Sequence, residues 1–420
     1  MSKKNIFSAP FDVSWLHKPV IQKLLTVLQS EGAEVFAVGG CVRDSFWKRE
    51  VKEIDLAINV DPIRVKELVN KIDCKVLYAG FQYGTVTVIL EEQKFEITSF
   101  RKDIKTFGRK VKVQYTDNLV EDAKRRDFTF NTIYLNSNSL IVDPLGNFSD
   151  LQSGKVKFVG DPNRRINEDH LRILRYFRFI GRFPNENKNP DKITLNAIAN
   201  NKSLILKLSG QRIWNELKLI LASQEVIAPI CLMNKTGVLG LLFPKARPNR
   251  LMSMINLEKL LMKIINKKSQ FKSVTFCDPI RRLALLTEGR ESAQRVILPL
   301  DNREKRNLEF YQSRAEIDSI CYDSVGYQHG LQRGVDLLLW SLRNSEKHEN
   351  VIFEKELSLK LRCYLKKIVV GSLAKFPLTG NDLLNHGYSG KKLGLTLKEL
   401  EKSWIASGFS LSKSQLLKKA

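Results

Sequence analysis

VFAVGGCVRDSFWKREVKEIDLAI, residues 35–58, predicts a strand, a tight turn, a short helix and a second strand in close succession. The apolar run Val35–Val38 is typical of a buried strand, and Gly39-Gly40 ends it in a turn that leads into the helix. Backbone amides at the start of a helix can bind phosphate. A glycine pair alone would as readily be an ordinary turn, so its meaning depends on the residues of the second strand.

Two carboxylates lie on that second strand, at Glu53 and Asp55. Because alternate side chains of a strand share a face, both are expected to point the same way. Carboxylate oxygens are the protein ligands that Mg²⁺ prefers. We therefore predict a magnesium and triphosphate site in which Glu53 and Asp55 are catalytic and bind metal. The candidate nucleotide-binding residues beside them are Gly39, Gly40, Arg43 and Asp44.

The charge of the chain predicts an anionic partner. The formal net charge is +24 and the pI is near 9.7. The length of 420 residues is enough for two or more domains. Nucleic acid is the leading candidate partner, and an acidic membrane surface is the weaker alternative. No long apolar run predicts a membrane span, and the N-terminus lacks a secretory signal, so we expect a cytoplasmic protein with reduced, mostly buried cysteines. A weakly basic organellar presequence is the alternative, although Asp12 comes early and no arginine precedes Arg43. The sequence does not indicate an oligomeric state.

The periodicity predicts an α+β fold, with a mixed-sheet head followed by an all-helical neck, body and tail. Expected in the head are helices at 18–31 and 62–72 and strands at 84–90 and 94–100. Beyond it, helices are expected at 166–182, 190–200, 209–223, 225–237, 279–287, 304–323, 329–343 and 351–373. The predicted domains are a head at 1–155, a neck at 156–223, a body at 224–345 and a basic tail at 346–420.

Three further groups of residues carry candidate chemistry. Glu96, in the strand KFEITSF, can supply a third catalytic acid, although an exposed strand carboxylate is an equally good interpretation. The run RRDFTFN begins at Arg125 and offers two adjacent guanidiniums to phosphate. The run EDHLRILR begins at Glu168, and on one helix its Asp169 and Arg172 would share a face. An ordinary ion pair on a helix is the alternative for these last two residues.

These motifs resemble those of the nucleotidyltransferase branch that contains tRNA CCA-adding enzymes and bacterial poly(A) polymerases. The family pattern is G-G-x-x-R-D with D-x-D on the next strand, then R-R-D-F-x-x-N, E-D-x-x-R-x-x-R and S-x-E-R-I-x-x-E-L. The chain departs from it at Glu53, where the family has Asp, and at Gln211, where it has Glu. The resemblance implies that the incoming nucleotide is bound by Arg125, Arg126, Asp127, Asn131, Asp169, Arg172 and Arg175.

The resemblance also implies a chemistry for selecting the base. A carboxylate at Asp169 can accept a hydrogen bond from an exocyclic amine, while Arg172 donates to the adjacent ring nitrogen. Cytosine and adenine present that pair of groups, whereas uracil and guanine present the reverse. The pair would thus select C and A without a nucleic-acid template. The role of Arg212, touching substrate or bracing helices, stays open.

Full CCA addition is the activity that the resemblance favours. The run GFQYGTV at 80–86 is closer to CCA-adding enzymes than to poly(A) polymerases, and 101–115 resembles the flexible loop needed to pass from C to A. The implied cofactor is Mg²⁺ in a two-metal site, the substrates are CTP and ATP, and the partner is the tRNA acceptor end, contacted by Lys391 and Lys392 in the tail. The alternatives are a poly(A) polymerase and, because of Glu53, a catalytically weak RNA-binding relative.

Overall fold

The computed structural model describes residues 5–107, 110–183, 190–265, 268–287, 298–313, 322–342 and 351–420. The chain forms two compact units, of which the first is mainly Met1–Ile220 with Ala228–Leu241. The second unit is mainly Leu242–Arg295 and Pro299–Ala420. The predicted head and the predicted neck as far as Ile220 lie in the first unit. The finer division into four domains stays a prediction.

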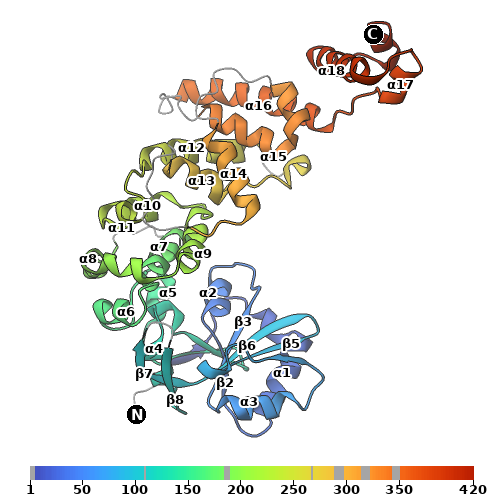
Figure 1. Cartoon of the computed structure of the whole chain (residues 1–420). Coiled ribbons are helices and arrows are strands. Elements are labelled where there is room, and N and C mark those ends of the chain that lie inside the picture. Colours follow the sequence, from blue (N-terminus) through green and yellow to red (C-terminus); the bar gives the residue numbers. More distant parts are fainter. Residues whose placement is uncertain are drawn as a thin grey trace. The chain divides into compact units, whose positions relative to one another are not determined.

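The first unit is built on a mixed eight-stranded sheet, and the α+β fold class is confirmed (Figure 1). The strand order is β1-β10-β9-β2-β3-β6-β5-β4, with only β3 and β6 parallel among the neighbours. The strands are β1 (Asn5–Ser8), β2 (Val35–Val38), β3 (Ile54–Ile58), β4 (Lys75–Leu77), β5 (Thr85–Leu90), β6 (Gln93–Ser99), β9 (Tyr134–Asn136) and β10 (Leu140–Asp143). A separate antiparallel hairpin joins β7 (Arg101–Phe107) to β8 (Lys110–Tyr115).

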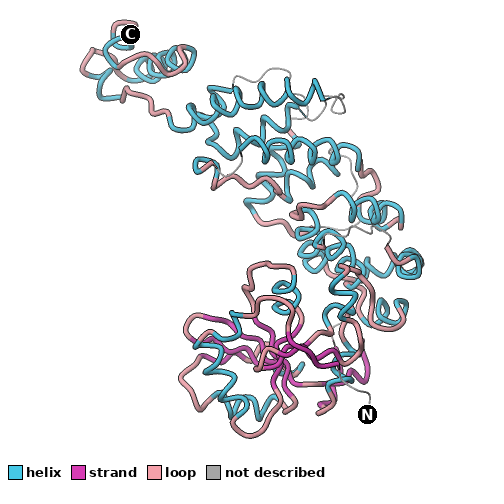
Figure 2. The backbone as a smooth tube through the Cα atoms, turned by 180° about the vertical axis from the view of Figure 1, so that it is seen from behind, coloured by secondary structure: helices cyan, strands magenta, loops and turns pink. Residues whose placement is uncertain are grey.

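Helices cover this sheet and continue the chain beyond it, and Figure 2 shows the strands gathered in the head alone among the described residues. The head helices are α1 (Pro19–Gln29), α2 (Gly40–Phe46), α3 (Pro62–Val69), α4 (Leu119–Arg125) and α5 (Phe148–Gln152). The next helices along the chain are α6 (Pro162–Glu168), α7 (Arg172–Arg182), α8 (Lys192–Asn201), α9 (Gly210–Leu221), α10 (Ile227–Lys235) and α11 (Val238–Leu242).

Local sequence signals explain the start of these helices. Pro19 and Pro62 occupy the first positions of α1 and α3, where a missing amide hydrogen costs nothing. Asp61 caps α3 by accepting hydrogen bonds from the next backbone amides. In α1 the leucines and isoleucine at helical spacing are buried, and α1 and α3 pack side by side against the sheet (Figure 1). Both predicted helices are thereby confirmed, with slightly shorter ends.

An aromatic cluster joins α7 to the head. The rings of Phe128 and Phe158 stack with centroids 4.8 Å apart, and Phe128 lies 5.2 Å from Phe179 of α7. Phe130 contacts Phe179 at 4.9 Å and Phe183 at 4.8 Å. All five rings are buried, so that they stabilise one orientation of α7 on the head.

The second unit is entirely helical in its described residues. Its helices are α12 (Pro248–Ile265), α13 (Pro279–Leu286), α14 (Asn302–Gln312), α15 (Tyr322–Leu342), α16 (Val351–Leu373), α17 (Gly380–Leu384), α18 (Gly390–Ala406) and α19 (Lys413–Leu417). Helices α15 and α16 pack along each other, and a Cβ at Gly326 of α15 would overlap the carbonyl oxygen of Ile368 in α16 (Figure 1). Glycine is needed there because the two backbones approach so closely.

A buried ionic network lies at the centre of the second unit. Glu258 of α12 accepts hydrogen bonds from Arg281 and Arg282 of α13, and Arg281 also donates to Asp336 of α15. The hydroxyl of Tyr311 donates to Asp336 at 2.8 Å. All five side chains are buried. A charged side chain that is buried away from water is tolerated only where other groups hydrogen-bond to it. Because the partners come from different helices, this network specifies how α12, α13 and α15 pack.

Three sequence expectations are corrected by the structure. The single helix predicted at 166–182 is two helices, because the chain is extended at Asp169 (φ −149°, ψ 110°). Within the segment 101–115, expected as a flexible loop, the described residues 101–107 and 110–115 form the paired strands β7 and β8. Only Cys41 is buried among the five described cysteines, all of which are free thiols. The end of the helix predicted at 304–323 falls partly outside the described residues.

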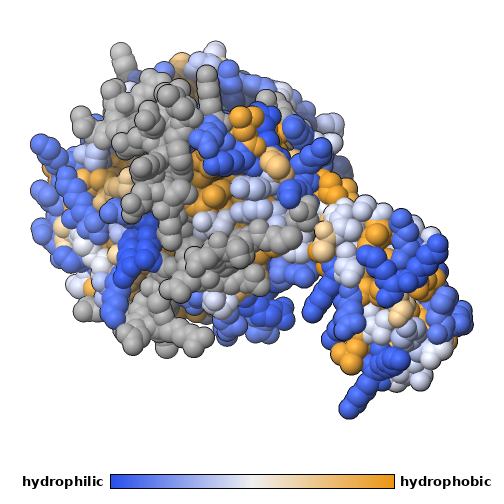
Figure 3. Space-filling model, turned by 90° about the horizontal axis from the view of Figure 1, so that it is seen from above, coloured by the Kyte–Doolittle hydropathy of each residue, from blue (hydrophilic) through white to orange (hydrophobic). Residues whose placement is uncertain are grey.

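The visible surface in Figure 3 is largely hydrophilic, with hydrophobic residues exposed only in small patches. Within the described ranges, no helix combines the length and the apolar character that crossing a membrane requires.

The ionic network predicts a large cost for removing its shared acid. Glu258→Ala leaves Arg281 and Arg282 buried beside a missing carboxylate, which should reduce the local stability by about 3–5 kcal/mol. Hydrogen exchange of the α13 amides measures this free energy. The control is Glu225→Ala, which removes an exposed ion pair with Lys259 and should cost less than about 1 kcal/mol. Equal effects of the two substitutions would contradict the structural role of the network.

Candidate active site

One cavity of about 1100 Å³ in the first unit collects most of the predicted site residues. It is lined by Gly39, Gly40, Arg43, Asp44, Glu53, Asp55, Arg125, Arg126, Asp127, Asn131, Asp169, Arg172 and Arg175. Nine arginines and seven acidic residues line it in all. Residues more than a hundred positions apart in the sequence therefore meet around one space, as their motifs predicted.

Gly39 closes the turn after β2 and lies beside the predicted catalytic acid. Its backbone has φ +72° and ψ −117°, a conformation that only glycine adopts without strain. A Cβ at this position would lie 3.8 Å from Oδ2 of Asp55 and 3.9 Å from Nη1 of Arg126. These are ordinary van der Waals distances, so the backbone conformation is what requires glycine at this turn between the acid on β3 and the arginine after α4.

Asp55 is a partly buried carboxylate on β3. Burial raises its pKa to about 6, and the nearby charges of Glu96 and Glu53 add to the increase, while Arg126 and Arg43 oppose it. Among the described residues, none donates a hydrogen bond to its carboxylate oxygens. An acid in this condition favours a bound cation, because a cation would stabilise its ionised form.

The other two predicted acids lie in different surroundings. Glu53 lines the cavity but is exposed and comes just before β3, not within it. Glu96 faces Asp55 across the parallel pair of β3 and β6, but its carboxylate bonds Lys94 at 2.6 Å and does not line the cavity. In the described part of the chain, no three His, Cys, Asp or Glu side chains are arranged to hold a metal by themselves.

The residues present nevertheless fit a magnesium ion that shares its ligands with a substrate. Mg²⁺ is usually bound by one or two carboxylates together with phosphate oxygens and water. Asp55 offers an unpaired carboxylate, and Glu53 lines the same cavity. A complete set of protein ligands is therefore not required at this position.

The adjacent arginines are held by an acid that sequence reasoning missed. Asp122, buried in α4, accepts hydrogen bonds from Arg125 at 2.8 Å and from Arg126 at 3.0 Å. The hydroxyl of Tyr134 donates to the same carboxylate at 2.7 Å. Burial alone would raise the pKa of Asp122, but Arg126, Arg125 and Tyr134 together lower it to about 2. Its i,i+3 and i,i+4 spacing to the arginines was the signal that could have identified it.

Asp127 contacts Arg175 of α7 and Asn131, not the two arginines that precede it in the sequence. Instead of orienting Arg125 or Arg126, it accepts from Nε of Arg175 at 2.8 Å and from Nη2 at 2.5 Å. Its other oxygen accepts from Asn131 at 2.9 Å, and Asn131 in turn accepts from Arg43 at 3.2 Å. The chain of contacts fixes Arg43 and Arg175 at the wall of the cavity.

Asp169 and Arg172 do not share a helix face, contrary to the sequence expectation. Asp169 lies between α6 and α7, where its two oxygens accept from Nη2 of Arg212 at 3.0 and 3.1 Å. Arg172 instead bonds Glu168 at 2.7 Å and the carbonyl oxygen of Arg125 at 3.4 Å. Both residues still line the cavity, so that base selection by the two remains geometrically possible.

Two more arginines of α7 face the cavity and were also missed. Arg178 and Arg182 continue the spacing of Arg172 and Arg175 along one side of the helix, which was the available signal. Burial and the neighbouring charge of Arg175 lower the pKa of Arg178 to about 10. Arg178 contacts Glu216 and Arg182 contacts Asp44, so the arginines of this wall have acidic partners. Over the whole cavity, however, nine arginines exceed seven acids, and a bound anion would reduce that excess of positive charge. Lys391 and Lys392, predicted to contact RNA, are exposed at the start of α18 in the second unit.

Two family profiles match the chain. One, described as a poly A polymerase head domain, covers residues 35–157. The other, described as a probable RNA and SrmB-binding site of polymerase A, covers residues 189–249. Among curated proteins, the mitochondrial CCA tRNA nucleotidyltransferase 1 of Mus musculus is 32% identical over 403 residues, which is 94% of this chain and 88% of the mouse protein.

Solved structures share the fold. The CCA-adding enzyme of Thermotoga maritima complexed with tRNA aligns with a TM-score of 0.66 at 18% identity, covering 99% of this chain and 98% of that one. A CCA-adding enzyme in complex with ATP aligns with the same TM-score at 19% identity and the same coverage.

Because the pKa of Asp55 is raised, ionisation of its carboxylate should destabilise the metal-free protein. Its folded pKa of about 6 exceeds the ordinary 3.8, so ionisation reduces stability as the pH rises from about 4 to 6, and the loss persists above that. Asp55→Asn removes this loss. In EDTA at pH 7.5 the variant should melt at a higher temperature than the wild type, and the difference should vanish near pH 4.

Asp122→Asn is the matched control for this experiment. Because the pKa of Asp122 is lowered to about 2, its carboxylate stabilises the fold at every pH above 3.8 and loses that effect only as the pH falls towards 2. This variant should therefore melt at a lower temperature than the wild type at pH 7.5. A lower melting temperature for Asp55→Asn as well would show that Asp55 is an ordinary paired acid.

Proposed function

This chain belongs to the CCA tRNA nucleotidyltransferase family, and we propose that it adds the 3′-terminal CCA to tRNA with CTP and ATP as substrates. The observation that carries the proposal is the single cavity around which an unpaired acid, a row of arginines and an acidic residue beside α7 meet. The names of the relatives support the same substrates: one solved structure of this fold is a complex with tRNA and another with ATP.

We assign triphosphate binding to the arginines that line the cavity. Arg125 and Arg126 would bind the phosphates, because Asp122 leaves part of each guanidinium free to donate further hydrogen bonds. Arg43 and Arg175 are held through Asn131 and Asp127 at the same wall. Fixed donors of this kind stabilise the charge that develops on the phosphates without having to reorient.

Asp55 would hold magnesium, with Glu53 as the second carboxylate. Bound Mg²⁺ supplies neutralisation of the triphosphate charge and lowers the pKa of the attacking tRNA 3′-hydroxyl. The ionised Asp55 carboxylate lies next to Gly39, which leaves room for the substrate beside it. The carboxylate of Glu96 is paired with Lys94, so we do not assign it to the metal. We keep Glu96 as a neighbour whose negative charge raises the pKa of Asp55.

We assign base selection to Asp169 with Arg172. Asp169 retains lone pairs beyond those taken by Arg212, so its carboxylate can accept from the amine of cytosine or adenine. Arg212 would then be a positioning residue, since it holds the carboxylate without a need to touch the base. Arg172 is already anchored to α6 and to the head, which limits the directions in which it can donate.

The compartment belongs to the proposal too. We propose the cytoplasm, as predicted from the sequence, although the mouse relative is named a mitochondrial protein. The basic tail, with Lys391 and Lys392, is proposed to contact the phosphates of tRNA, which would make binding steeply dependent on salt.

Incubation with a tRNA transcript that lacks CCA tests the activity directly. With CTP and ATP present, the product should grow by three nucleotides and stop, and Asp55→Ala should abolish growth because the unpaired acid is lost. Gel electrophoresis at single-nucleotide resolution measures both. Long A-tails would favour the poly(A) polymerase alternative, and tRNA binding without any growth would favour the inactive relative suggested by Glu53.

Substitution of Asp169 tests base selection. Asp169→Ala removes the acceptor for the base amine, so the preference for CTP over UTP should fall on the order of tenfold to a hundredfold, the effect of losing about 1–3 kcal/mol of discrimination. Single-turnover incorporation rates with each nucleotide measure the change. The control Asp117→Ala removes an exposed carboxylate outside the cavity and should keep the wild-type preference. Unchanged selectivity in Asp169→Ala would overturn the assignment.

A further inference from the structure

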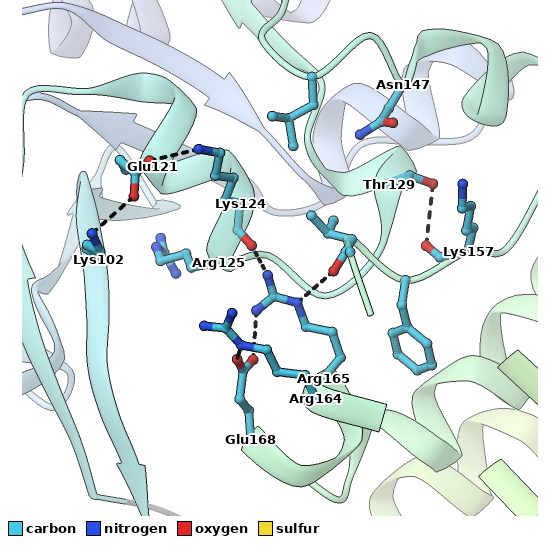
Figure 4. A pocket seen from close by; sticks show the side chains of 14 residues that line it. Lys102, Glu121, Lys124, Arg125, Thr129, Asn147, Lys157, Arg164, Arg165 and Glu168 are labelled. Carbon is cyan, nitrogen blue, oxygen red and sulfur yellow. Dashed lines mark hydrogen bonds and ion pairs between the residues drawn. The ribbon is translucent and has the colours of Figure 1, made fainter. Parts of the chain in front are cut away.

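A second cavity of about 720 Å³ lies between α4, α6 and the segment 157–160 (Figure 4). We call it the α4–α6 cavity. It is separate from the proposed active site but adjoins it, because Arg125 and Glu168 line both cavities. The fold, the family comparison and the proposed mechanism leave this space without a role.

Positive charge dominates the α4–α6 cavity. Six cationic and two acidic side chains line it, a formal excess of four positive charges. Glu168 already accepts from Arg164 at 3.2 Å, from Arg165 at 2.7 Å and from Arg172 at 2.7 Å. Glu121 likewise contacts both Lys124, at 3.0 Å, and Lys102, at 3.6 Å. The acids are thus shared among more cations than they can neutralise.

The cations divide into a fixed floor and an exposed rim. Arg165 is held by the carbonyl oxygens of Lys124 and Val159 as well as by Glu168, which anchors it in the position drawn in Figure 4. At the rim, 77% of the Arg164 side chain is exposed. Lys157 is exposed too, and no described acid pairs with it. Such a rim can bind an anion at small cost, because few existing contacts must break.

The lining also indicates which anion fits. Among the described residues that line it, the one aromatic ring is Phe158, which is buried in the cluster with Phe128. The described lining therefore offers no exposed ring on which a base could stack. Contacts to phosphate need no such ring, and lysine and arginine provide most of them. A ligand recognised by phosphate and not by base therefore fits this lining.

We propose that the α4–α6 cavity binds phosphodiester groups of the primer RNA strand, which is the tRNA strand whose 3′ end is extended. The inference rests on the proposed function, since it assigns to the same RNA substrate a second point of contact in the first unit. Lys157 and Arg164 bind the phosphates at the rim, and Arg165 provides the fixed positive charge beneath them. Because Arg125 borders both cavities, a strand held here lies beside the space in which its 3′ end reacts.

The double variant K157A/R164A tests the site in the full-length protein. Fluorescence anisotropy measures its affinity for the tRNA transcript lacking CCA between 50 and 300 mM salt. Two lost phosphate contacts should reduce the slope of log K against log salt by about 1.4 and raise Kd roughly tenfold near physiological salt. The KM for CTP and kcat at saturating tRNA should stay unchanged, because neither side chain lines the active site.

A charge-matched control separates this site from general electrostatics. K155A/K192A removes two exposed lysines of the same unit that do not line the cavity, and its Kd should stay within about twofold of the wild type. Lys102→Gln, on the opposite wall, is an independent second variant, expected to reduce the slope by about 0.7. Melting temperatures establish that each variant is folded.

Two results would overturn the inference. Unchanged tRNA affinity and salt slope in both K157A/R164A and Lys102→Gln would exclude RNA from the cavity. Unchanged tRNA affinity with weaker inhibition by inorganic pyrophosphate would assign the cavity to free phosphate instead. A wild-type protein that adds no nucleotides would remove the proposed function itself, whereas normal addition with either of these results removes only the α4–α6 site.

Discussion

The contact between Arg175 and Asp127 is the interaction on which the arrangement of the site depends. It ties α7 to the head segment just before the short 3-10 helix Thr129–Asn131, through two hydrogen bonds to one carboxylate oxygen of Asp127. Only 13% of the Asp127 side chain is exposed, so its charge is tolerated because both oxygens are fully used. The aromatic cluster around Phe128 and Phe179 lies beside this contact and excludes alternative positions of the helix. With α7 held in this way, its arginines line one wall of the cavity.

The acids around the cavity differ in chemistry because their neighbours differ. Asp122 has two guanidiniums and a hydroxyl around it, and its pKa is lowered to about 2. Burial and the charges of nearby acids raise the pKa of Asp55 to about 6. One acid therefore positions arginines, and the carboxylate of the other has no hydrogen-bond donor among the described residues. An unsatisfied charge of this kind reduces stability, which is a common property of functional sites.

Much of the fold could be predicted from local patterns. Helix α1 follows from its apolar spacing and α3 from Pro62 and the cap at Asp61, and the turn at Gly39 follows from the glycine pair. These signals are local, so they favour the same secondary structure whatever the tertiary surroundings of the segment. The hairpin of β7 and β8 was not predicted, because strand pairing depends on a partner that composition alone does not reveal. The break at Asp169 was missed for a similar reason: Arg212, forty-three residues away, holds its carboxylate outside a helix.

The sequence by itself determined the inventory of the site, namely the turn at Gly39, the acids Glu53 and Asp55, and the arginines of the later motifs. Residue type and spacing suffice for this, since they reflect the chemistry that each side chain can perform. Only the tertiary structure decided which acid is paired and which is free. It placed Asp127 on Arg175 and left the Asp55 carboxylate without a donor among the described residues. The charge of a carboxylate is set by the groups around it in space, and those groups come from distant parts of the chain.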